Sequence, residues 1–303
     1  MPILVLLLIS VSAGTLVFWA GRRYPTPVGT PPTDMAEKAS VHIEAEMERH
    51  PWLLRLVQGR LDPATATGLA LTLALGLAIV GGLLVGAFAY LVRSSETLVD
   101  ADRSVGQWGV DHATAWSTDA LQLVTELGSS LFIVPATLLL AVVEYRRVPN
   151  RWMPVFLLAV VAGEIILVNT IKELLDRLRP DFYEITETLG PSFPSGHSGL
   201  AAAFYAAAAL VLARKRSPRR RALLAAAAVA IAVAVACSRV LLGVHWMSDV
   251  VAGLAFGWAW FGICAIAFGG RFLVLGAPVE AAAEVAEEHI AARDGPAAAG
   301  QTS

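Results

Sequence analysis

Charged residues are scarce in this sequence: they make up only 16% of its 303 residues, whereas 56% are hydrophobic and the mean hydropathy is +0.62. Soluble globular proteins carry about a quarter charged residues, so this composition excludes an ordinary soluble domain. An excess of one charge is also missing, because the formal net charge is only −2. Without a strong positive field, the chain has no general affinity for nucleic acid. We therefore expect a membrane protein whose partners do not include nucleic acid.

Cysteine is nearly absent as well. Cys237 and Cys264 are the only two, and each lies in an apolar segment. Two such residues cannot form a disulfide framework, and their spacing matches no metal-ligand motif, so we interpret them as small packing residues. His42 and His50 lie near several glutamates, but their spacing also matches no ligand pattern, and an exposed helix face explains them.

Apolar segments of spanning length are what the sequence has in abundance. A helix rises about 1.5 Å per residue, so about 20 apolar residues cross the roughly 30 Å of hydrocarbon in a bilayer. We expect seven transmembrane helices, at residues 2–20, 67–92, 127–143, 153–171, 198–213, 222–237 and 250–268. Residues 94–126 mix charges with tryptophans, which favours a helical connection at the outer interface. The predicted fold is all-α, a polytopic bundle of membrane helices.

Basic residues predict how this bundle is oriented. They gather in three loops, at residues 22–23, 146–151 and 214–221. Lys and Arg are enriched in cytoplasmic loops, so all three are expected in the cytoplasm, and the last run needs no nucleic-acid or lipid partner to explain it. The first apolar segment carries its arginines behind it, which favours a retained helix over a signal peptide. We expect a multi-pass protein of the cell membrane with its N-terminus outside and its C-terminus in the cytoplasm.

Residues suited to binding a phosphate gather at the predicted outer ends of these spans. Three short segments carry them: Lys172 with Arg179-Pro180, then Pro194-Ser195-Gly196-His197, then Ser238-Arg239 with His245 and Asp249. Three cations can neutralise a phosphate dianion. The second segment directly precedes an apolar helix, so it is predicted to offer a capping hydroxyl and a backbone amide without a Cβ at the positive end of that helix.

Two histidines and an aspartate can carry out phosphoryl transfer. Asp249 follows His245 by four residues, so on a helix their side chains would meet on one face. The carboxylate would then accept the Nδ1 proton and leave Nε2 of His245 free as a nucleophile or base. An exposed ion pair is the alternative. His197, beside the predicted cap, can protonate the leaving group.

Each of these features has an ordinary explanation when taken alone. Lys172, Arg179 and Arg239 resemble snorkelling cations at helix ends. Together with the histidines they favour a phosphate site. They lie on the outer side of the membrane, where the positive-inside bias disfavours cations, and snorkelling does not account for histidines.

Two polar residues of the preceding span must face protein or water: we expect Asn169 to line the site and Glu164 to be structural.

The three segments read Lys172-x6-Arg179-Pro180, Pro194-Ser195-Gly196-His197 and Ser238-Arg239-x5-His245-x3-Asp249. In residue type and spacing they resemble the signature segments of the type 2 phosphatidic acid phosphatase (PAP2) superfamily, also called lipid phosphate phosphatases. The resemblance implies a six-helix phosphatase core at residues 67–270. An extra N-terminal transmembrane helix (1–23) and a cytoplasmic linker and helix (24–66) would precede this core, and a partly disordered cytoplasmic tail (271–303) would follow it.

The resemblance also implies a role for each site residue. His245 would be the nucleophile that forms a phosphohistidine, Asp249 would orient it, and His197 would protonate the leaving group and then activate water. The non-bridging phosphate oxygens would be held by Lys172, Arg179, Ser195, Gly196 and Arg239. The segments contain no carboxylate cluster suited to Mg²⁺, so we expect catalysis without a metal or other cofactor.

The expected reaction is hydrolysis of a lipid phosphate or diphosphate at the outer membrane face. Candidate substrates are phosphatidate, phosphatidylglycerol phosphate and polyprenyl diphosphates such as undecaprenyl diphosphate, each held with its tail in the bilayer. Two alternatives stay open. One is a lipid phosphotransferase, in which an acceptor hydroxyl replaces water; the other is a catalytically silent membrane transporter or scaffold.

Overall fold

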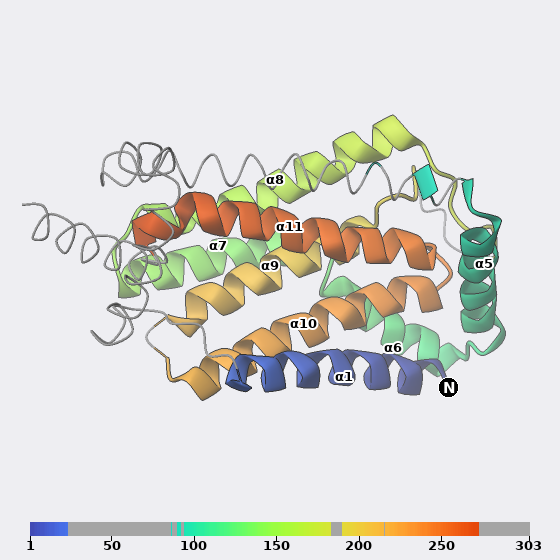
Figure 1. The fold of residues 1–303 in the computed structure, drawn as a ribbon, viewed down its shortest axis with the longest axis horizontal. Coiled ribbons are helices and arrows are strands. Elements are labelled where there is room, and N and C mark those ends of the chain that lie inside the picture. The colour runs from blue at the N-terminus through green and yellow to red at the C-terminus, as the bar shows by residue number, and fades with distance from the viewer. Residues whose placement is uncertain (24–85, 87–89, 92–93, 183–189, 215, 273–303) are drawn as a thin grey trace, which may run out of the picture. The chain divides into compact units, whose positions relative to one another are not determined.

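The computed structural model describes residues 1–23, 86, 90–91, 94–182, 190–214 and 216–272, and this part of the chain contains helices and no strand. Its long elements are α1 (Pro2–Arg23), α5 (Glu96–Asp111), α6 (Ala115–Glu126), α7 (Ser130–Arg147), α8 (Trp152–Leu175), α9 (Gly196–Ala213), α10 (Pro218–Leu241) and α11 (Met247–Phe272). Figure 1 shows most of them running side by side. The all-α prediction is confirmed.

Five helices, α1, α8, α9, α10 and α11, are long and apolar enough to cross a membrane. They correspond to the predicted spans at 2–20, 153–171, 198–213, 222–237 and 250–268, which are confirmed as helices of spanning length. The predicted span at 67–92 lies outside the described residues except for Gly86, Tyr90 and Leu91, which are helical. The predicted segment 24–66 and nearly all of the tail 271–303 also lie outside them.

Residues 94–126 were expected to form a helical connection, and they form two helices, α5 and α6. Helix α6 is followed by α7 at a 41° bend, and together the two make a sixth candidate span. Ser129 begins α7, because its side chain accepts a hydrogen bond from the Phe132 amide. Leu121 of α6 is 1% exposed and packs with Leu6 and Leu241, so α6 belongs to the core.

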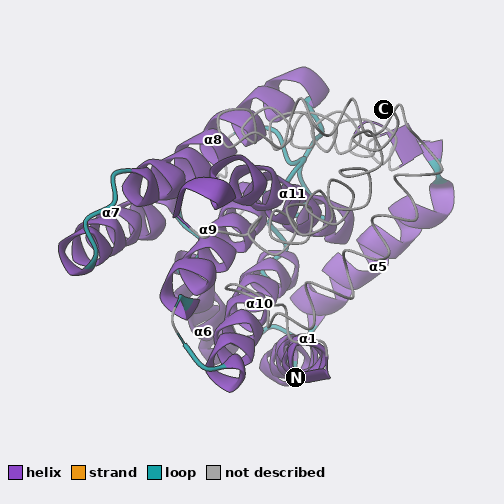
Figure 2. Cartoon of the chain, turned by 60° about the vertical axis from the view of Figure 1, so that its left-hand side comes forward, coloured by secondary structure: helices purple, strands orange, loops and turns teal. Residues whose placement is uncertain are grey.

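Helix α10 lies at the centre of the packing, in contact with α1, α5, α6 and α9. Figure 2, which views the bundle from another direction, also places α1 and α10 next to each other. Small residues allow this proximity: a Cβ on Gly14 of α1 would lie 3.0 Å from the Ala226 carbonyl oxygen and 3.1 Å from the Ala230 Cβ. The first span is thus packed against the bundle.

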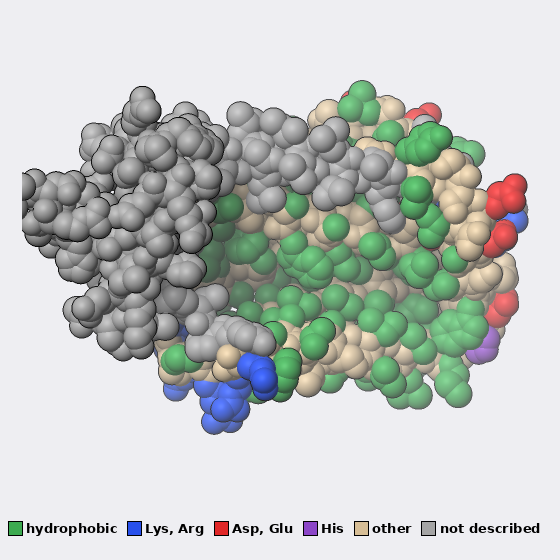
Figure 3. Space-filling view, viewed as in Figure 1, with side chains coloured by type: hydrophobic (Ala, Val, Ile, Leu, Met, Phe, Trp, Pro, Cys, Tyr) green, Lys and Arg blue, Asp and Glu red, His purple; other side chains and the backbone are tan. Residues whose placement is uncertain are grey.

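Apolar side chains also cover the outside of the helices, as lipid requires. Exposed examples come from several helices: Leu4, Leu8, Leu131, Leu139 and Ile166. On the face drawn in Figure 3, hydrophobic side chains cover the middle, while Lys and Arg gather near one end and acidic side chains near the other. On this face the basic and the acidic side chains are therefore separated along the length of the helices.

Glycines bring α9 and α11 into close contact. A Cβ on Gly253 would lie 3.1 Å from the Ser198 Cβ, and a Cβ on Gly257 would lie 2.9 Å from the Ala202 Cβ and run into the Gly199 carbonyl oxygen. Gly253 and Gly257 are four residues apart, which is the small-residue spacing that lets membrane helices approach through their backbones. This contact fixes where the first turn of α9 lies, along the helix axes, relative to the first turn of α11.

Gly257→Ala should therefore separate α9 from α11 and lower the thermal unfolding temperature of the purified protein in detergent. Overpacking of this kind costs about 1–3 kcal/mol. Gly86→Ala is the matched control, since a Cβ there meets no atom within 4 Å. Equal unfolding temperatures for the two variants would contradict the close packing.

Candidate functional site

The first signature segment begins in the last turn of α8. Lys172 lies there, and Asp176 ends the helix in the left-handed conformation, with φ 40°. Left-handed residues terminate helices, so Arg177 and Arg179 follow in a non-helical stretch. The Ser192 amide donates a hydrogen bond of 2.7 Å to the Arg177 carbonyl, which joins this stretch to the chain that leads into α9.

The second segment forms the start of α9. Ser195 is the N-cap residue, and its amide donates to the Asp249 carbonyl oxygen at 3.0 Å, which ties α9 to α11. The predicted capping role of its hydroxyl is wrong: among the described residues that oxygen accepts from the Ser198 hydroxyl at 3.0 Å and from no backbone amide. The first-turn amides of a helix lack intrahelical acceptors, so those of Gly196 and His197 are free to bind an anion.

The third segment spans the turn between α10 and α11. Gly243, with φ 68°, lets the chain turn after α10, and His245 lies in this turn rather than on a helix with Asp249. The two side chains nevertheless meet, with His245 Nδ1 3.4 Å from Asp249 Oδ2. They are 2% and 0% exposed, so the alternative of an exposed ion pair is wrong.

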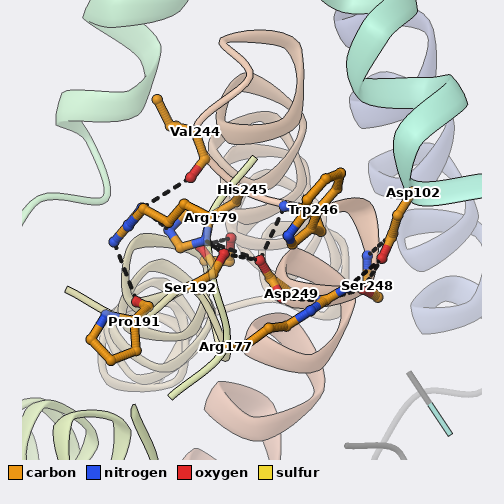
Figure 4. A network of polar contacts seen from close by, with 12 residues as sticks. Asp102, Arg177, Arg179, Pro191, Ser192, Val244, His245, Trp246, Ser248 and Asp249 are labelled. Atoms are coloured by element: carbon orange, nitrogen blue, oxygen red, sulfur yellow. Dashed lines mark hydrogen bonds and ion pairs between the residues drawn. The ribbon is translucent and has the colours of Figure 1, made fainter. Parts of the chain in front are cut away.

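The contacts of His245 determine which ring nitrogen carries the proton (Figure 4). Arg179 Nη1 lies 3.3 Å from Nε2, and a guanidinium can only donate, so Nε2 presents its lone pair. Nδ1 therefore carries the proton and faces Asp249 Oδ2 and, at 3.3 Å, the Ser192 hydroxyl oxygen. Ser192 donates its own proton to Asp249, which leaves its oxygen free to accept from Nδ1.

The surroundings of His245 keep its ring neutral. Burial lowers the pKa of His245 to about 4, against the hydrogen bond and charge of Asp249, and Arg239 and Arg179 lower it further. Burial likewise lowers the pKa of Arg179, while the charge of Asp249 opposes the shift. At neutral pH the imidazole is therefore unprotonated at Nε2, the state in which this nitrogen can act as a nucleophile or as a base.

The three predicted cations lie near one another and keep donors available. Lys172 interacts electrostatically with Arg179 and Arg239, and no hydrogen bond or ion pair joins it to another described residue. Arg239 donates from Nη1 to Thr125 Oγ1 at 3.1 Å, but its buried Nε has no partner among the described residues. His197 interacts electrostatically with all three cations and with His245. The fold thus brings residues from all three segments into one cluster.

An ionic network that sequence reasoning missed supports this cluster. Arg177 donates from Nη1 to Asp249 Oδ1 at 2.5 Å and from Nη2 to Asp102 Oδ2 at 2.9 Å. Asp102 comes from α5, is 1% exposed, and also accepts from the amide and hydroxyl of Ser248 at 2.8 and 2.5 Å. The sequence did offer a signal for Arg177, because this cation lies two positions before Arg179 in the first segment. Asp102 gave no such signal, because it is far away in the sequence.

No group of three or more His, Cys, Asp or Glu side chains within the described ranges is arranged to hold a metal ion. Asn169 lines a cavity together with Gly196 and His197.

Comparisons with known proteins identify the family. The sequence model of the PAP2 superfamily matches residues 154–272. Phosphatidylglycerophosphatase B of Bacillus subtilis is 32% identical over 162 residues, which cover 52% of this chain and 78% of that protein. The chain belongs to the PAP2 superfamily. It is therefore a PAP2-type membrane phosphatase.

Two further relatives fit this family. The crystal structure of a transmembrane PAP2-type phosphatidylglycerolphosphate phosphatase from Bacillus subtilis superposes with a TM-score of 0.57 and 28% identity, covering 61% of this chain and 92% of that one. Lipid A 1-phosphatase of Rhizobium etli is 37% identical over 122 residues, which is 37% of this chain and only 48% of that protein. All eight predicted site residues lie inside the PAP2 match, whereas α1, α5 and Asp102 lie outside it.

The Arg177 contact makes a prediction for the titration of His245 in this PAP2 chain. Arg177 offsets part of the Asp249 charge, so Arg177→Met should strengthen the pull of Asp249 on a protonated imidazole. We expect the pKa of His245 to rise from about 4 in the wild type toward 6.5, the ordinary value. Nitrogen NMR of histidine-labelled protein, with the His245 signals assigned by their loss in His245→Ala, measures this.

Arg103→Met is the control for that titration, because it removes an exposed cation from the same helix as Asp102. It should leave the His245 titration unchanged. A wild-type His245 that titrates at or above 6.5 would contradict the buried, neutral imidazole described above.

Proposed function

We propose that this PAP2 chain hydrolyses the phosphate ester of a membrane lipid through a phosphohistidine on His245. The observation that carries the proposal is the Nε2 lone pair of His245, which Asp249 and Ser192 orient from the far side of the ring. Arg179, at 3.3 Å from Nε2, marks where a bound phosphate oxygen would lie. Nε2 attacks phosphorus, and the bond between phosphorus and the lipid oxygen breaks.

The phosphate would be bound by groups with hydrogen-bond donors that other described residues of the site do not use. Lys172 and the Nε of Arg239 have no described partner, and the Gly196 amide lies at the start of α9. With Arg179 and the Ser195 hydroxyl they can stabilise the charge of the five-coordinate transition state. Arg179, which donates to the Val244 carbonyl oxygen, and the Gly196 amide are held in position before substrate arrives, so little reorganisation of these two donors is needed.

His197 would handle the protons of both steps. It interacts electrostatically with His245 and begins the helix whose amides face the phosphate. In the first step it gives a proton to the departing lipid oxygen. In the second step it takes a proton from the water that attacks the phosphohistidine, and inorganic phosphate leaves.

The charge distribution supports an active site on the extracytoplasmic side. Arg219 and Arg220 at the start of α10 are exposed, and Arg239 lies near its end. A helix of 24 residues is about 36 Å long, which is enough to separate the basic loop from the site by the thickness of a bilayer. Since basic loops stay in the cytoplasm, the site would face outward and α11 would lead back to a cytoplasmic C-terminus.

The proposed substrates follow from the chemistry of the site and from the names of the relatives. Those relatives are named for phosphatidylglycerol phosphate and for lipid A 1-phosphate, both phosphate monoesters of lipids. Phosphatidate and polyprenyl diphosphates present the same terminal phosphate to the cations. Release of inorganic phosphate from a defined lipid distinguishes hydrolysis from transfer to an acceptor hydroxyl or from a silent protein.

Substitution of the two histidines should separate their roles. His245→Ala should abolish phosphate release from every substrate, because no phosphohistidine can form. His197→Ala should lower kcat/KM about 10²- to 10⁴-fold on a lipid phosphate and far less on an aryl phosphate, because kcat/KM reports the step in which the leaving group departs and an aryl leaving group needs no proton. Stopped phosphate-release assays on both substrates test this.

His112→Ala is the control for that experiment, since His112 is exposed directly after α5 and, within the described residues, its ring contacts the Trp108 carbonyl oxygen and ring. It should keep full activity. Equal losses for His197→Ala on good and poor leaving groups would exclude a proton-donating role.

Catalysis should persist in excess chelator. Protein cations are expected to supply the electrostatic stabilisation that Mg²⁺ supplies in other phosphatases. Phosphate release is measured before and after dialysis against EDTA, with and without added Mg²⁺. A strict Mg²⁺ requirement would contradict the proposal.

A further inference from the structure

A cavity of about 140 Å³ lies beside His197, between α7, α8 and α9. Gly196 and His197 form the wall that it shares with the phosphate site, and Leu200 and Val168 give it apolar sides. A cavity of about this volume can hold benzene, a molecule of six heavy atoms. Glycerol also has six, so the cavity can accept a fragment of a phospholipid head group.

Glu164 lines this cavity and is its most unusual feature. The side chain is 0% exposed, and neither carboxyl oxygen has a hydrogen-bond partner among the described residues. Its Oε1 lies against the backbone of α9, where a Cβ on Gly199 would collide with it. A structural carboxyl would have internal partners, so the expectation that Glu164 is structural finds no support in its contacts. A buried, unpaired carboxyl is costly unless a ligand or water pairs with it.

The position of the cavity indicates which part of a substrate reaches it. Glu164 precedes Lys172 by eight residues on α8, so it lies about 12 Å deeper in the bundle. If the phosphate lies at Gly196 and the cations, the leaving oxygen lies at His197. The alcohol attached to that oxygen then continues past His197 into the cavity, away from the phosphate.

We infer that this cavity binds the leaving alcohol and that Glu164 hydrogen-bonds a free hydroxyl on the carbon next to the ester carbon. The inference rests on the proposed function and narrows its substrate class to phosphate monoesters of a glycerol-type alcohol. Such a hydroxyl can donate to a carboxylate or accept from a carboxylic acid. An acylated oxygen or a second phosphate at that position offers no proton to the carboxylate and is larger or charged.

The test compares two lipids that differ only in that hydroxyl. One is phosphatidylglycerol phosphate, and the other is its analogue in which the middle hydroxyl of the terminal glycerol is replaced by hydrogen. We expect wild-type kcat/KM to favour the hydroxylated lipid about 10-fold, as one buried hydrogen bond allows. Glu164→Leu should bring the ratio near 1, and Glu164→Gln, whose amide still hydrogen-bonds, should keep part of it.

The ratio itself controls for damage to the fold, because a structural defect lowers kcat/KM for both lipids alike. Glu144→Gln is the matched control. Glu144 is also buried, but it pairs with Arg147 and Arg214 and does not line the cavity, so its variant should keep the wild-type ratio.

A wild-type ratio near 1, or an unchanged ratio in Glu164→Leu, overturns the inference and leaves the proposed function standing. A wild type that releases no phosphate from either lipid overturns both. If Glu164→Leu does not fold, the wild-type ratio and the Glu164→Gln variant decide.

Discussion

The buried charge of Asp249 is the constraint on which the site depends. Its side chain is 0% exposed, and its oxygens contact Arg177, Ser192, His245 and the Trp246 amide. A carboxylate away from water requires such partners, and removing any of them leaves the charge uncompensated. These partners come from the segment after α8, the segment before α9 and the turn before α11. One charge therefore holds together the parts of the chain that carry the signature residues.

Arg177 extends this constraint beyond the region that matches the PAP2 superfamily. Its guanidinium lies between two buried carboxylates, those of Asp249 and Asp102, and over the ring of Trp246 at 5.6 Å. Two carboxylates around one cation bind more strongly than one, because the fork of Arg can donate to both. As Asp102 belongs to α5, a helix outside the PAP2 match helps to hold Asp249 in position.

Backbone packing provides the second support. Gly253 and Gly257 let α11 approach α9 so closely that the Ser195 amide reaches the Asp249 carbonyl oxygen. The start of α9, where Gly196 and His197 lie, is thereby fixed relative to His245. In the proposed mechanism His245 attacks phosphorus while His197 protonates the leaving oxygen, so a displacement of one helix along the other would move the two groups out of reach of the same phosphate ester.

Much of the fold was predictable because membrane helices leave a strong local signal. Residues 2–20, 153–171 and 222–237 are apolar over a spanning length, and nothing but a helix satisfies their backbone groups in lipid. The pairing of α6 with α7 was not predictable in this way. Residues 115–126 are too polar and too short to be recognised alone, and only their packing with Leu6 and Leu241 places them in the bundle.

The sequence by itself determined the family and which residues are candidates for the chemistry, because Lys172, His197 and His245 lie in short segments whose spacing is informative. Only the tertiary structure decided which nitrogen of His245 presents its lone pair, that Asp102 contacts the arginine beside Asp249, and that Glu164 is buried without a hydrogen-bond partner in the part of the chain that the structure describes. Each of these depends on contacts between residues that are far apart in the chain, and such contacts leave no local pattern to read.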